Sequence, residues 1–379
     1  MRNTIYRLRS NQTSKLRVTS TIKKKRVEVG QTAWNGRIIQ FDNNNLYPNL
    51  LDLYIANSSY ASTVINVMRN FVYGNGFEDV NLNNTIFYNE LGLILSGKQL
   101  LADVIKDYCK FGTFAAHVKY NILGQPASIK PLQSKYCRLT TPCEDGEIKE
   151  IAYFDNWENF GGDLYMKEPL FLPVFNPDNV LQEFEDVGFE NHKGHIYMYK
   201  SGYGTYQESI WDSVISQIQT DVEVSNFRFR LVQNGLNATH LLAIPHLQDE
   251  VQLRELNAKI NNAQGSDNAG SVIVIDGVGK DSVPSLLALD SKNHDKMYTI
   301  IDDSTKNAIR RVLNVPPVLV GDLVSGKLGT SQEIVEAEQY FEKNTERFRV
   351  DIEEGLYDIL SKFYIPFQNI KIARRYGTN

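Results

Sequence analysis

The sequence lacks a cysteine framework and any long hydrophobic segment. Its 379 residues include three cysteines, Cys109, Cys137 and Cys143, which are too widely placed for a disulfide scaffold and point to a reducing compartment. No apolar run approaches the roughly 18 residues of a membrane span, and the N-terminus has no apolar core of a secretory signal. We therefore expect no membrane segment and no export through a secretory pathway.

Positive charge is not in excess either. Lys and Arg number 40 against 45 Asp and Glu, a net charge of -5, and the pI is near 5.8. This balance argues against tight binding of nucleic acid over the whole surface and leaves room for local contacts. The apolar content of 42% is enough for a real core, and the length allows one large domain or two to three ordinary ones.

Basic residues are concentrated at the N-terminus. Residues 1–27 hold nine Lys or Arg and no acidic residue. Such a block is typical of a solvated, poorly ordered arm. An arm that contacts nucleic acid or a scaffold, and an organelle transit peptide, are the alternatives. We interpret residues 1–39 as a basic, flexible N-terminal arm.

The stretch from Asp290 to Tyr364 organises the chain. Apolar residues at three- and four-residue intervals predict a helix that Asp290 caps. Pro316 and Pro317 end this helix because proline lacks the amide donor and disfavours a helical residue before it. The chain then turns at Gly321. The apolar positions of this helix are Met297, Ile300, Ile301, Ala308, Ile309, Val312 and Leu313.

A glycine-rich loop and a second amphipathic segment follow. Residues 321–329 contain three glycines, so a mobile loop is expected there. Thr330 and Glu333 form a capping box that restarts the helix. The apolar stripe then continues for over thirty residues, which predicts one helix about 50 Å long. Its members are Ile334, Ala337, Phe341, Phe348, Ile352, Leu356, Ile359 and Phe363.

The first 200 residues read as an α+β domain. Helical spacing predicts helices over 48–73, ended by Gly74-Asn75-Gly76, and over 97–110. Residues 111–200 read as mainly β, since turn residues separate the strand-like runs 115–120, 127–132, 148–154, 164–174 and 195–200.

A third amphipathic helix and a small module come next. The helix runs from Ser209 to Asn234, with Trp211, Val214, Ile215, Ile218, Val222, Phe229 and Val232 on its apolar face. The module combines strand 240–244, helix 247–262 and strand 271–276. It is too small to be stable alone.

Six segments of the chain resemble one known family. They are Asn70–Phe77, Asp107–Phe114, Tyr120–Gly124, Tyr203–Trp211, Val232–Ala238 and, above all, Leu313–Gly321. In residue type, order and approximate spacing they resemble the portal, or head–tail connector, proteins of tailed double-stranded DNA bacteriophages. The resemblance covers residues 40 to 364.

The resemblance implies an α+β portal fold. Its expected parts are an α/β wing (40–208), two antiparallel stem helices (209–235 and 285–315), a small α/β clip (236–284), a tunnel loop (316–330) and a long wing helix (331–364). Only a tail of residues 365–379 follows, so the family's C-terminal crown is expected to be short or absent.

The resemblance also implies a function and partners. Twelve subunits would close head to tail into a ring around an axial channel. The ring would sit at one capsid vertex of the virion, after assembly in the host cytoplasm, for genome packaging and DNA ejection. The implied partners are double-stranded DNA without sequence preference, the large subunit of terminase, the major capsid or scaffold protein and a head–tail adaptor, with no membrane.

The implied site is the tunnel loop. Its DNA-facing residues would be Gly321, Asp322, Leu323, Val324, Ser325, Gly326, Lys327, Leu328 and Gly329, held by the structural turn Val315, Pro316 and Pro317. A conduit must let DNA slide. Strong phosphate neutralisation would hold the duplex, because each neutralised phosphate adds to a salt-dependent affinity. One lysine per subunit gives weak, repeated contacts, so we hypothesise that Lys327 faces DNA. The alternative is an ordinary solvated loop lysine.

A phosphate-binding loop is the main competing interpretation. Gly321–Lys327 matches G-x-x-x-x-G-K, and the strand Val272–Asp276 resembles the acidic strand that supports magnesium in an ATPase. However, Leu328 stands where a hydroxyl is needed, two prolines precede too short an apolar run for a central strand, and the acidic strand comes before the loop instead of after it. A structural scaffold or adaptor that forms no conduit is the other alternative.

No catalytic, metal or cofactor site is expected. His192 and His195 with Cys137 and Cys143 contain zinc-ligand residue types, but their spacing matches no structural zinc pattern. We expect buried thiols and surface histidines there instead.

Overall fold

The computed structural model of the chain describes eleven segments, which form two packing units. The segments are residues 32–33, 36–42, 45–90, 92–157, 168–202, 204–233, 238–244, 271–276, 285–288, 294–322 and 331–375. The larger unit lies within residues 24–218 and 308–379, and the described part of the smaller unit lies within 219–307. Within the described segments, no helix is both apolar enough and long enough to cross a membrane.

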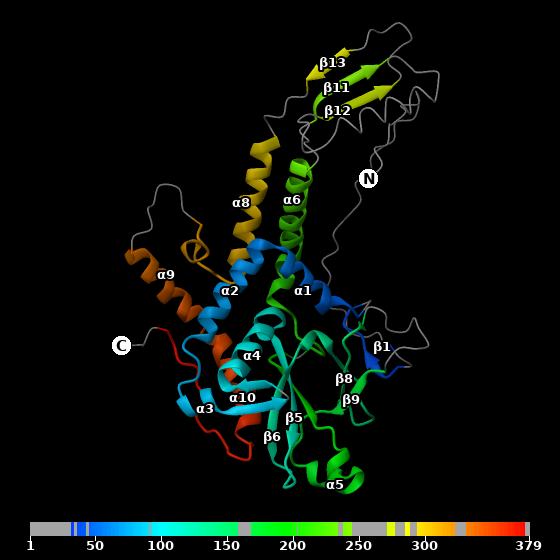
Figure 1. Ribbon diagram of the computed structural model, residues 1–379, viewed down its shortest axis with the longest axis vertical. Coiled ribbons are helices and arrows are strands. Elements are labelled where there is room, and N and C mark those ends of the chain that lie inside the picture. Colours follow the sequence, from blue (N-terminus) through cyan, green and yellow to red (C-terminus); the bar gives the residue numbers. More distant parts are fainter. Residues whose placement is uncertain are drawn as a thin grey trace. The chain divides into compact units, whose positions relative to one another are not determined.

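The first helical layer of the larger unit is α1 (Tyr47–Asn57), α2 (Ser59–Tyr73), α3 (Val80–Asn84) and α4 (Gly97–Phe111) (Figure 1). The prediction of one helix over 48–73 is wrong, because Ser58 separates two helices. Ser58 is buried and extended, and its Oγ accepts a hydrogen bond of 3.0 Å from the Ala61 amide. It is therefore the N-cap of α2.

Two three-stranded antiparallel sheets pack beneath these helices. In the first, β5 (Thr113–Tyr120) lies between β10 (His195–Lys200) and β6 (Pro126–Leu132). In the second, β8 (Glu150–Tyr153) lies between β7 (Cys137–Leu139) and β9 (Leu170–Pro173). The predicted strands are thus confirmed, although β8 and β9 are shorter than expected. Two small pairs complete the strands of this unit, β1 (Thr32–Ala33) with β2 (Ile38–Ile39) and β3 (Ile86–Glu90) with β4 (Leu93–Ser96).

One helix in this region was not predicted. Helix α5 (Val180–Val187) lies between β9 and β10. Its Val180, Leu181, Phe184 and Val187 follow helical spacing and Gly188 ends it, so the signal was present in the sequence.

The predicted single helix over 331–364 is two helices. Helix α9 (Ser331–Asn344) and helix α10 (Glu346–Leu360) meet at Thr345 and point in different directions (Figure 1). The main-chain carbonyl of Glu342 accepts hydrogen bonds from Thr345 Oγ1 (3.0 Å) and Arg349 Nη2 (2.8 Å). Side chains that bond to a helix carbonyl in this way interrupt the regular ladder and bend the helix.

The same arginine ties this bend to the core. Arg349 is buried, its Nη1 lies 3.0 Å from the buried Glu342 carboxylate, and it also donates to the Phe71 carbonyl at the end of α2. Farther along α10, Gly355 lies so close to the first sheet that a Cβ there would stand 2.6 Å from the rings of Phe114 and Tyr199. Glycine is therefore required for this helix–sheet approach.

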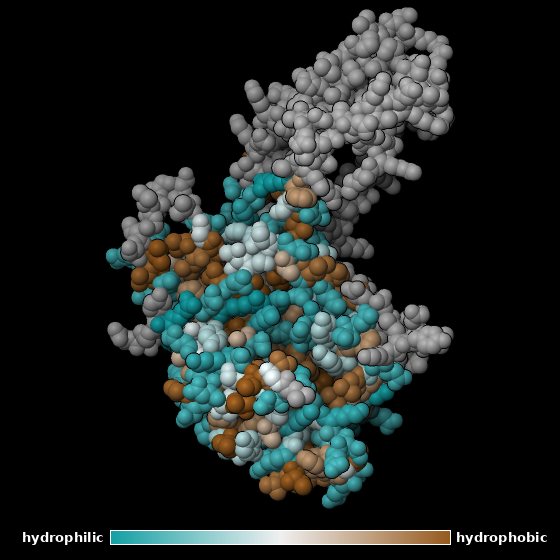
Figure 2. Space-filling model, viewed as in Figure 1, coloured by the Kyte–Doolittle hydropathy of each residue, from teal (hydrophilic) through white to brown (hydrophobic). Residues whose placement is uncertain are grey.

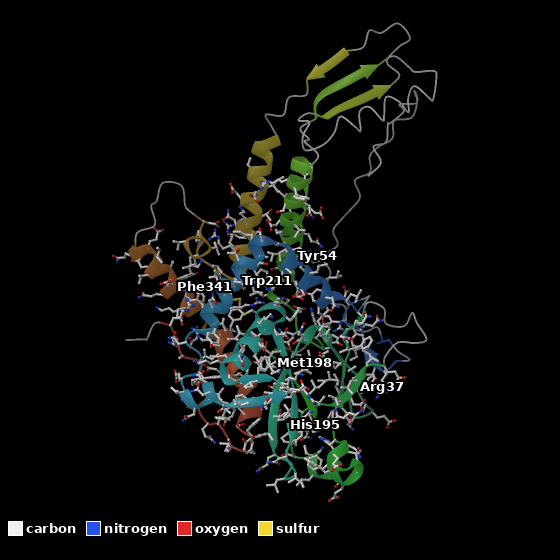
Figure 3. The ribbon with its side chains drawn as sticks, viewed as in Figure 1. Arg37, Tyr54, His195, Met198, Trp211 and Phe341 are labelled. Carbon is white, nitrogen blue, oxygen red and sulfur yellow. The ribbon has the colours of Figure 1, made fainter. Side chains whose placement is uncertain are left out.

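Only one end of each of two helices, the start of α6 and the C-terminal end of α9, is buried in the main core. Trp211 is fully buried beside the start of α6 (Ile215–Gln233), and its indole N–H donates to the Cys109 carbonyl of α4 (Figure 3). Phe341, at the C-terminal end of α9, is also buried. By contrast Ile334, near the start of α9, is exposed, so the predicted buried stripe holds for only part of this segment.

The smaller unit contains most of α6 and of α8 (His294–Val312), which run side by side in opposite directions (Figure 1). Arg228 of α6 reaches Asp302 of α8 at 3.4 Å. Phe229 is 66% exposed and Ile300 is 69% exposed, although both belong to predicted apolar stripes. The stripes are therefore buried near the larger unit's core, at Trp211, Ile218 and Ile309, and exposed at Phe229 and Ile300.

A three-stranded sheet also belongs to the smaller unit. β11 (Ala238–Ile244) pairs in parallel with β12 (Ser271–Asp276) and antiparallel with β13 (Ser285–Ala288). The two predicted strands are confirmed, whereas residues 285–288, assigned to the second stem helix, form a strand. The predicted helix 247–262 and the cap at Asp290 lie outside the described residues.

A partly buried carboxylate on α4 gives the larger unit a dependence on pH. Asp107 accepts hydrogen bonds from the amide (2.7 Å) and the hydroxyl of Ser134. Burial nevertheless raises the pKa of Asp107 from 3.8 to about 6. The folded state therefore binds this proton more tightly than the unfolded state does. The resulting stabilisation is complete below the unfolded pKa of 3.8 and is lost as pH rises through about 6.

We predict that Asp107→Asn removes this dependence. The free energy of unfolding of the variant, relative to wild type, should rise between about pH 4 and pH 7 by on the order of 3 kcal/mol. Urea unfolding of both proteins at several pH values measures it. The exposed Asp186→Asn is the control, and a difference for Asp107→Asn that does not change with pH would contradict the prediction.

Candidate functional site

The predicted turn at Val315 is a buried anchor. Helix α8 ends in a turn where the Asn314 amide donates to Arg311 O (3.1 Å) and the Val315 amide to Arg310 O (3.2 Å). Asn314 has a φ of +52°, a left-handed conformation that suits the end of a helix. Val315 is 2% exposed and belongs to the main core. The chain therefore leaves α8 at a fixed point.

The residues after the turn form a short helix instead of a strand. Pro317–Val320 is the 3-10 helix η5, and Gly321, with a φ of +82°, ends it. The Asp322 amide closes the turn by donating to Pro317 O at 3.0 Å. A phosphate-binding loop requires a central strand immediately before its glycines. The strand that an ATPase of this type needs before its glycine loop is therefore replaced by a 3-10 helix, which argues against the ATPase interpretation.

A long-range hydrogen bond fixes the far end of this turn. Tyr60 of α2 donates its hydroxyl proton to Asp322 Oδ2 across 2.5 Å. Burial and the Asp322 carboxylate both raise the pKa of Tyr60, so the phenol remains a donor at neutral pH. Leu319 and Val320 pack against the main core on the same side. The beginning of the predicted tunnel loop is thus attached to the rigid part of the molecule.

A groove of about 480 Å³ lies beside the turn. It separates the end of α8 from α9 and combines cationic and carboxylate side chains with apolar ones. Its lining residues are Arg310, Arg311, Asn314, Val315, Pro316, Glu333, Glu336, Ala337 and Tyr340. Mixed charge of this kind fits a polypeptide segment better than a phosphate group.

The structure brings together only part of the predicted site. Val315, Pro316, Pro317, Gly321 and Asp322 form one hydrogen-bonded unit. The remaining loop residues, Leu323–Gly329 with Lys327, and the predicted cap at Thr330 lie outside the described residues. The contact of Lys327 with DNA therefore stays a prediction. The residue that sequence reasoning missed is Tyr60, which lies 262 positions from its partner and shares no local motif with it.

The thiols and histidines differ from expectation. Cys109 and Cys137 are buried, and burial raises the pKa of each thiol to about 12. Cys143 is exposed, contrary to the prediction of buried thiols. The prediction of surface histidines is also wrong, because the side chain of His195 is fully buried and that of His192 is 8% exposed. Both rings pack against the aromatic ring of Tyr120.

We predict that Tyr60→Phe loosens the base of the loop. Loss of the hydroxyl leaves the Asp322 carboxylate without this donor, so the Gly321 and Asp322 amides should exchange hydrogen several-fold faster. Hydrogen exchange read by mass spectrometry measures the effect. Tyr340→Phe, an exposed tyrosine lining the same groove, is the control. Equal exchange in both variants would show that the bond does not hold the loop.

Comparison with known proteins adds evidence on the fold. No protein-family model matches the chain. The chain is similar to the phage-like element PBSX protein XkdE of Bacillus subtilis (strain 168), with 22% identity over 265 residues. The alignment covers 62% of this chain and 54% of XkdE, so the chain spans about half the length of this curated relative.

Solved structures match over a larger share of the chain. A chain in the virion of a native gene transfer agent particle has a TM-score of 0.53 and 14% identity, with 89% of this chain and 84% of that one covered. A chain in the neck of the native particle, computed with C12 symmetry, gives the same TM-score and identity over 83% and 80%. An HK97 family phage portal protein from Corynebacterium diphtheriae aligns at 9% identity over 82% of this chain and 90% of that one, with a TM-score of 0.46. The α+β fold expected from the sequence is confirmed, and chains of a gene transfer agent particle share it.

Proposed function

We propose that the protein is the portal of a phage or phage-like particle. In this role a ring of subunits forms the channel for packaging and ejection of double-stranded DNA and docks terminase and the tail or neck proteins. The observation that carries the proposal is the shared fold with a chain of a particle neck computed with C12 symmetry. The similarity to a protein of a phage-like element supports the same setting.

The elements of the two units fit the expected parts of a portal subunit. We assign the larger unit, with its two antiparallel sheets and α10, to the wing. We assign the antiparallel pair α6 and α8 to the stem, and the sheet β11–β13 to the clip. The salt bridge between Arg228 and Asp302 supports the pairing of the stem helices.

Exposed apolar side chains support assembly into a ring. Phe229 and Ile300 on the stem helices stand in solvent in the single chain, as do Ile334 and Val335 on α9. Figure 2 shows hydrophobic surface over α9 on the face in view. Monomeric proteins rarely expose gathered apolar surface, whereas association buries it. A neighbouring subunit is the natural cover for these residues, and head-to-tail contacts of this kind close into rings.

The loop after Asp322 is the proposed contact with DNA. The bond from Tyr60 and the turn at Val315 hold its starting point. With a net charge of -5 on the chain, one Lys327 per subunit gives the duplex weak, sequence-independent contacts.

Electron microscopy of the purified protein tests the assembly. We expect closed rings with an axial hole, and averaging of end-on views should give twelve subunits. A preparation of monomers at high protein concentration, or of filaments without a hole, would contradict the proposal. Filaments would instead favour a scaffold or adaptor.

Lys327→Glu tests the proposed contact with DNA. Replacing twelve positive charges in the channel by twelve negative ones should weaken the hold on packaged DNA, so capsids should retain several-fold less genome after a salt or heat challenge. Lys362→Glu, at an exposed position outside the loop, makes the same charge change and should retain as much genome as wild type. Equal retention in both variants would rule out the contact while leaving ring formation as a separate result.

A further inference from the structure

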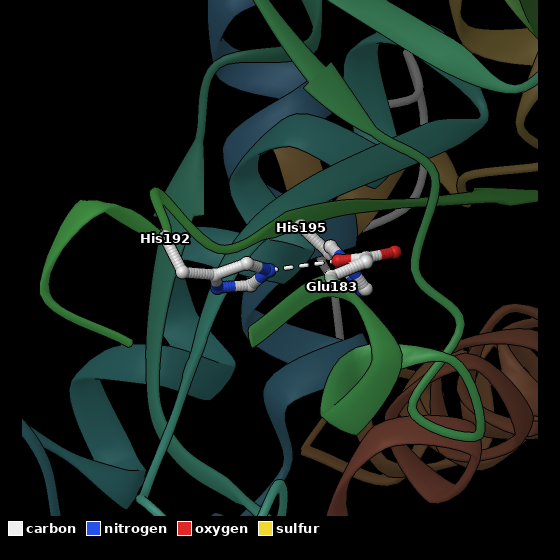
Figure 4. A group of neighbouring side chains, drawn as sticks. All are labelled: Glu183, His192 and His195. Carbon is white, nitrogen blue, oxygen red and sulfur yellow. Dashed lines mark hydrogen bonds and ion pairs between the residues drawn. The ribbon is translucent and has the colours of Figure 1, made fainter. Parts of the chain in front are cut away.

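Three side chains with metal-ligand atoms converge at the edge of the first sheet. Glu183 comes from the first turn of α5, His192 from the connection that follows it, and His195 from the first position of β10 (Figure 4). Glu183 Oε2 lies 2.8 Å from His192 Nε2 and 2.7 Å from His195 Nε2. All three ligand atoms lie within 4.8 Å of one another.

The surroundings hold both imidazoles in place. His195 is fully buried, and its ring meets the Tyr120 ring edge to face at 4.9 Å. The His192 ring packs between Phe184, at 5.0 Å, and Tyr120, at 5.8 Å. Gly194 has a φ of +87°, so the chain between the two histidines turns tightly enough to direct both Nε2 atoms to one point.

We propose that Glu183, His192 and His195 bind a transition-metal dication, with Zn²⁺ as the best chemical match. Two imidazole nitrogens and one carboxylate oxygen form a ligand set used by zinc sites, with further positions left for water. Nitrogen ligands select zinc and its neighbours over Mg²⁺ and Ca²⁺.

The required movement is at most about 1.5 Å, because the two nitrogens lie within 4.8 Å of each other. Ligand atoms about 2.0–2.1 Å from a tetrahedral ion stand roughly 3.3 Å apart. The carboxylate oxygen already lies 2.7–2.8 Å from each nitrogen, so each pair must separate by only about half an ångström. Glu183 is 28% exposed, which gives the ion a path from solvent to the two more deeply buried histidines.

The hydrogen bonds define the tautomer of both histidine rings in the absence of metal. The Asn176 amide donates to His195 Nδ1 (3.2 Å) and the Gly194 amide to His192 Nδ1 (3.3 Å). Each Nε2 therefore carries the ring proton and donates it to Glu183. Metal binding moves each of these protons from Nε2 to Nδ1, so neither ring changes its charge.

A neighbouring tyrosine can accept one of these protons. Tyr120 Oη lies 2.6 Å from His195 Nδ1, within reach of the relocated N–H. Such a partner orients a ligating histidine and strengthens the site. The Asn176 and Gly194 amides give up their bonds to the two Nδ1 atoms in exchange, which lowers the affinity below that of a site already arranged for metal.

The role that follows is mechanical. The ion would join α5 to β10 and Tyr120 of β5 through one centre. Val180 of α5 is buried and Phe184 packs partly buried against the main core, whereas Leu181 and Val187 are exposed. A metal clamp would therefore fix its position on the sheet edge.

A metal titration of the full-length protein tests the proposal. The chain carries Cys143→Ser, because this exposed thiol is another ligand for metals, and any polyhistidine tag is removed. After treatment with chelator and dialysis, Zn²⁺ is titrated by calorimetry and Co²⁺ by visible absorption. We expect one ion per chain, with the strong visible bands of four-coordinate cobalt.

Matched variants locate the site. Glu183→Gln keeps an oxygen acceptor for one histidine, and His192→Gln alters the more accessible ring. Each should weaken Zn²⁺ binding at least tenfold, and Tyr120→Phe should weaken it by a factor within the range of about 10–100 seen for outer-shell partners. Glu185→Gln, which makes the same change at an exposed position of α5 outside the cluster, should bind as wild type does.

Two results would overturn the proposal. One is the absence of saturable binding in protein whose circular dichroism and melting temperature are normal. The other is equal affinity in Glu183→Gln and Glu185→Gln. Either result would leave the three residues as a hydrogen-bonded structural cluster. Ring formation by electron microscopy is read separately, so these outcomes do not depend on the portal assignment.

Discussion

The burial of Leu313 and Val315 in the main core is the constraint on which the functional part of the chain depends. Because both side chains are buried in the main core, the C-terminal end of α8 is held there. The prolines that follow then direct the chain along α2. Helix η5 and the bond from Tyr60 to Asp322 then set the point from which the glycine loop departs. Solvent exposure of this turn would release the loop from the core.

Sequence periodicity predicted most helices and strands of this fold but not the breaks within them. Apolar spacing continues across Ser58 and across Thr345, so it indicates one helix where the chain forms two. Both breaks rest on hydrogen bonds between side chains and the main chain, and the second also needs Arg349 to reach Phe71, which is 278 positions away. Such partners become visible only in the folded chain.

The candidate site was predictable where its chemistry is local. Proline and glycine act on their own neighbours, so the turn at Val315–Pro317 and the change of direction at Gly321 followed from residue type. The Tyr60 anchor required tertiary structure. The cluster at Glu183 stands between these cases, because the helical spacing of α5 was readable, whereas the burial of His195 depends on the pairing of β10 with β5.

The joint at Thr345 has a consequence for how force passes through the subunit. Helix α10 is packed into the core, whereas the first half of α9 stands in solvent. The Arg349 side chain holds the joint through an ion pair with Glu342 of α9 and a hydrogen bond to the Phe71 carbonyl of α2. A force that acts on the exposed face of α9 therefore reaches α10 and α2 through this joint.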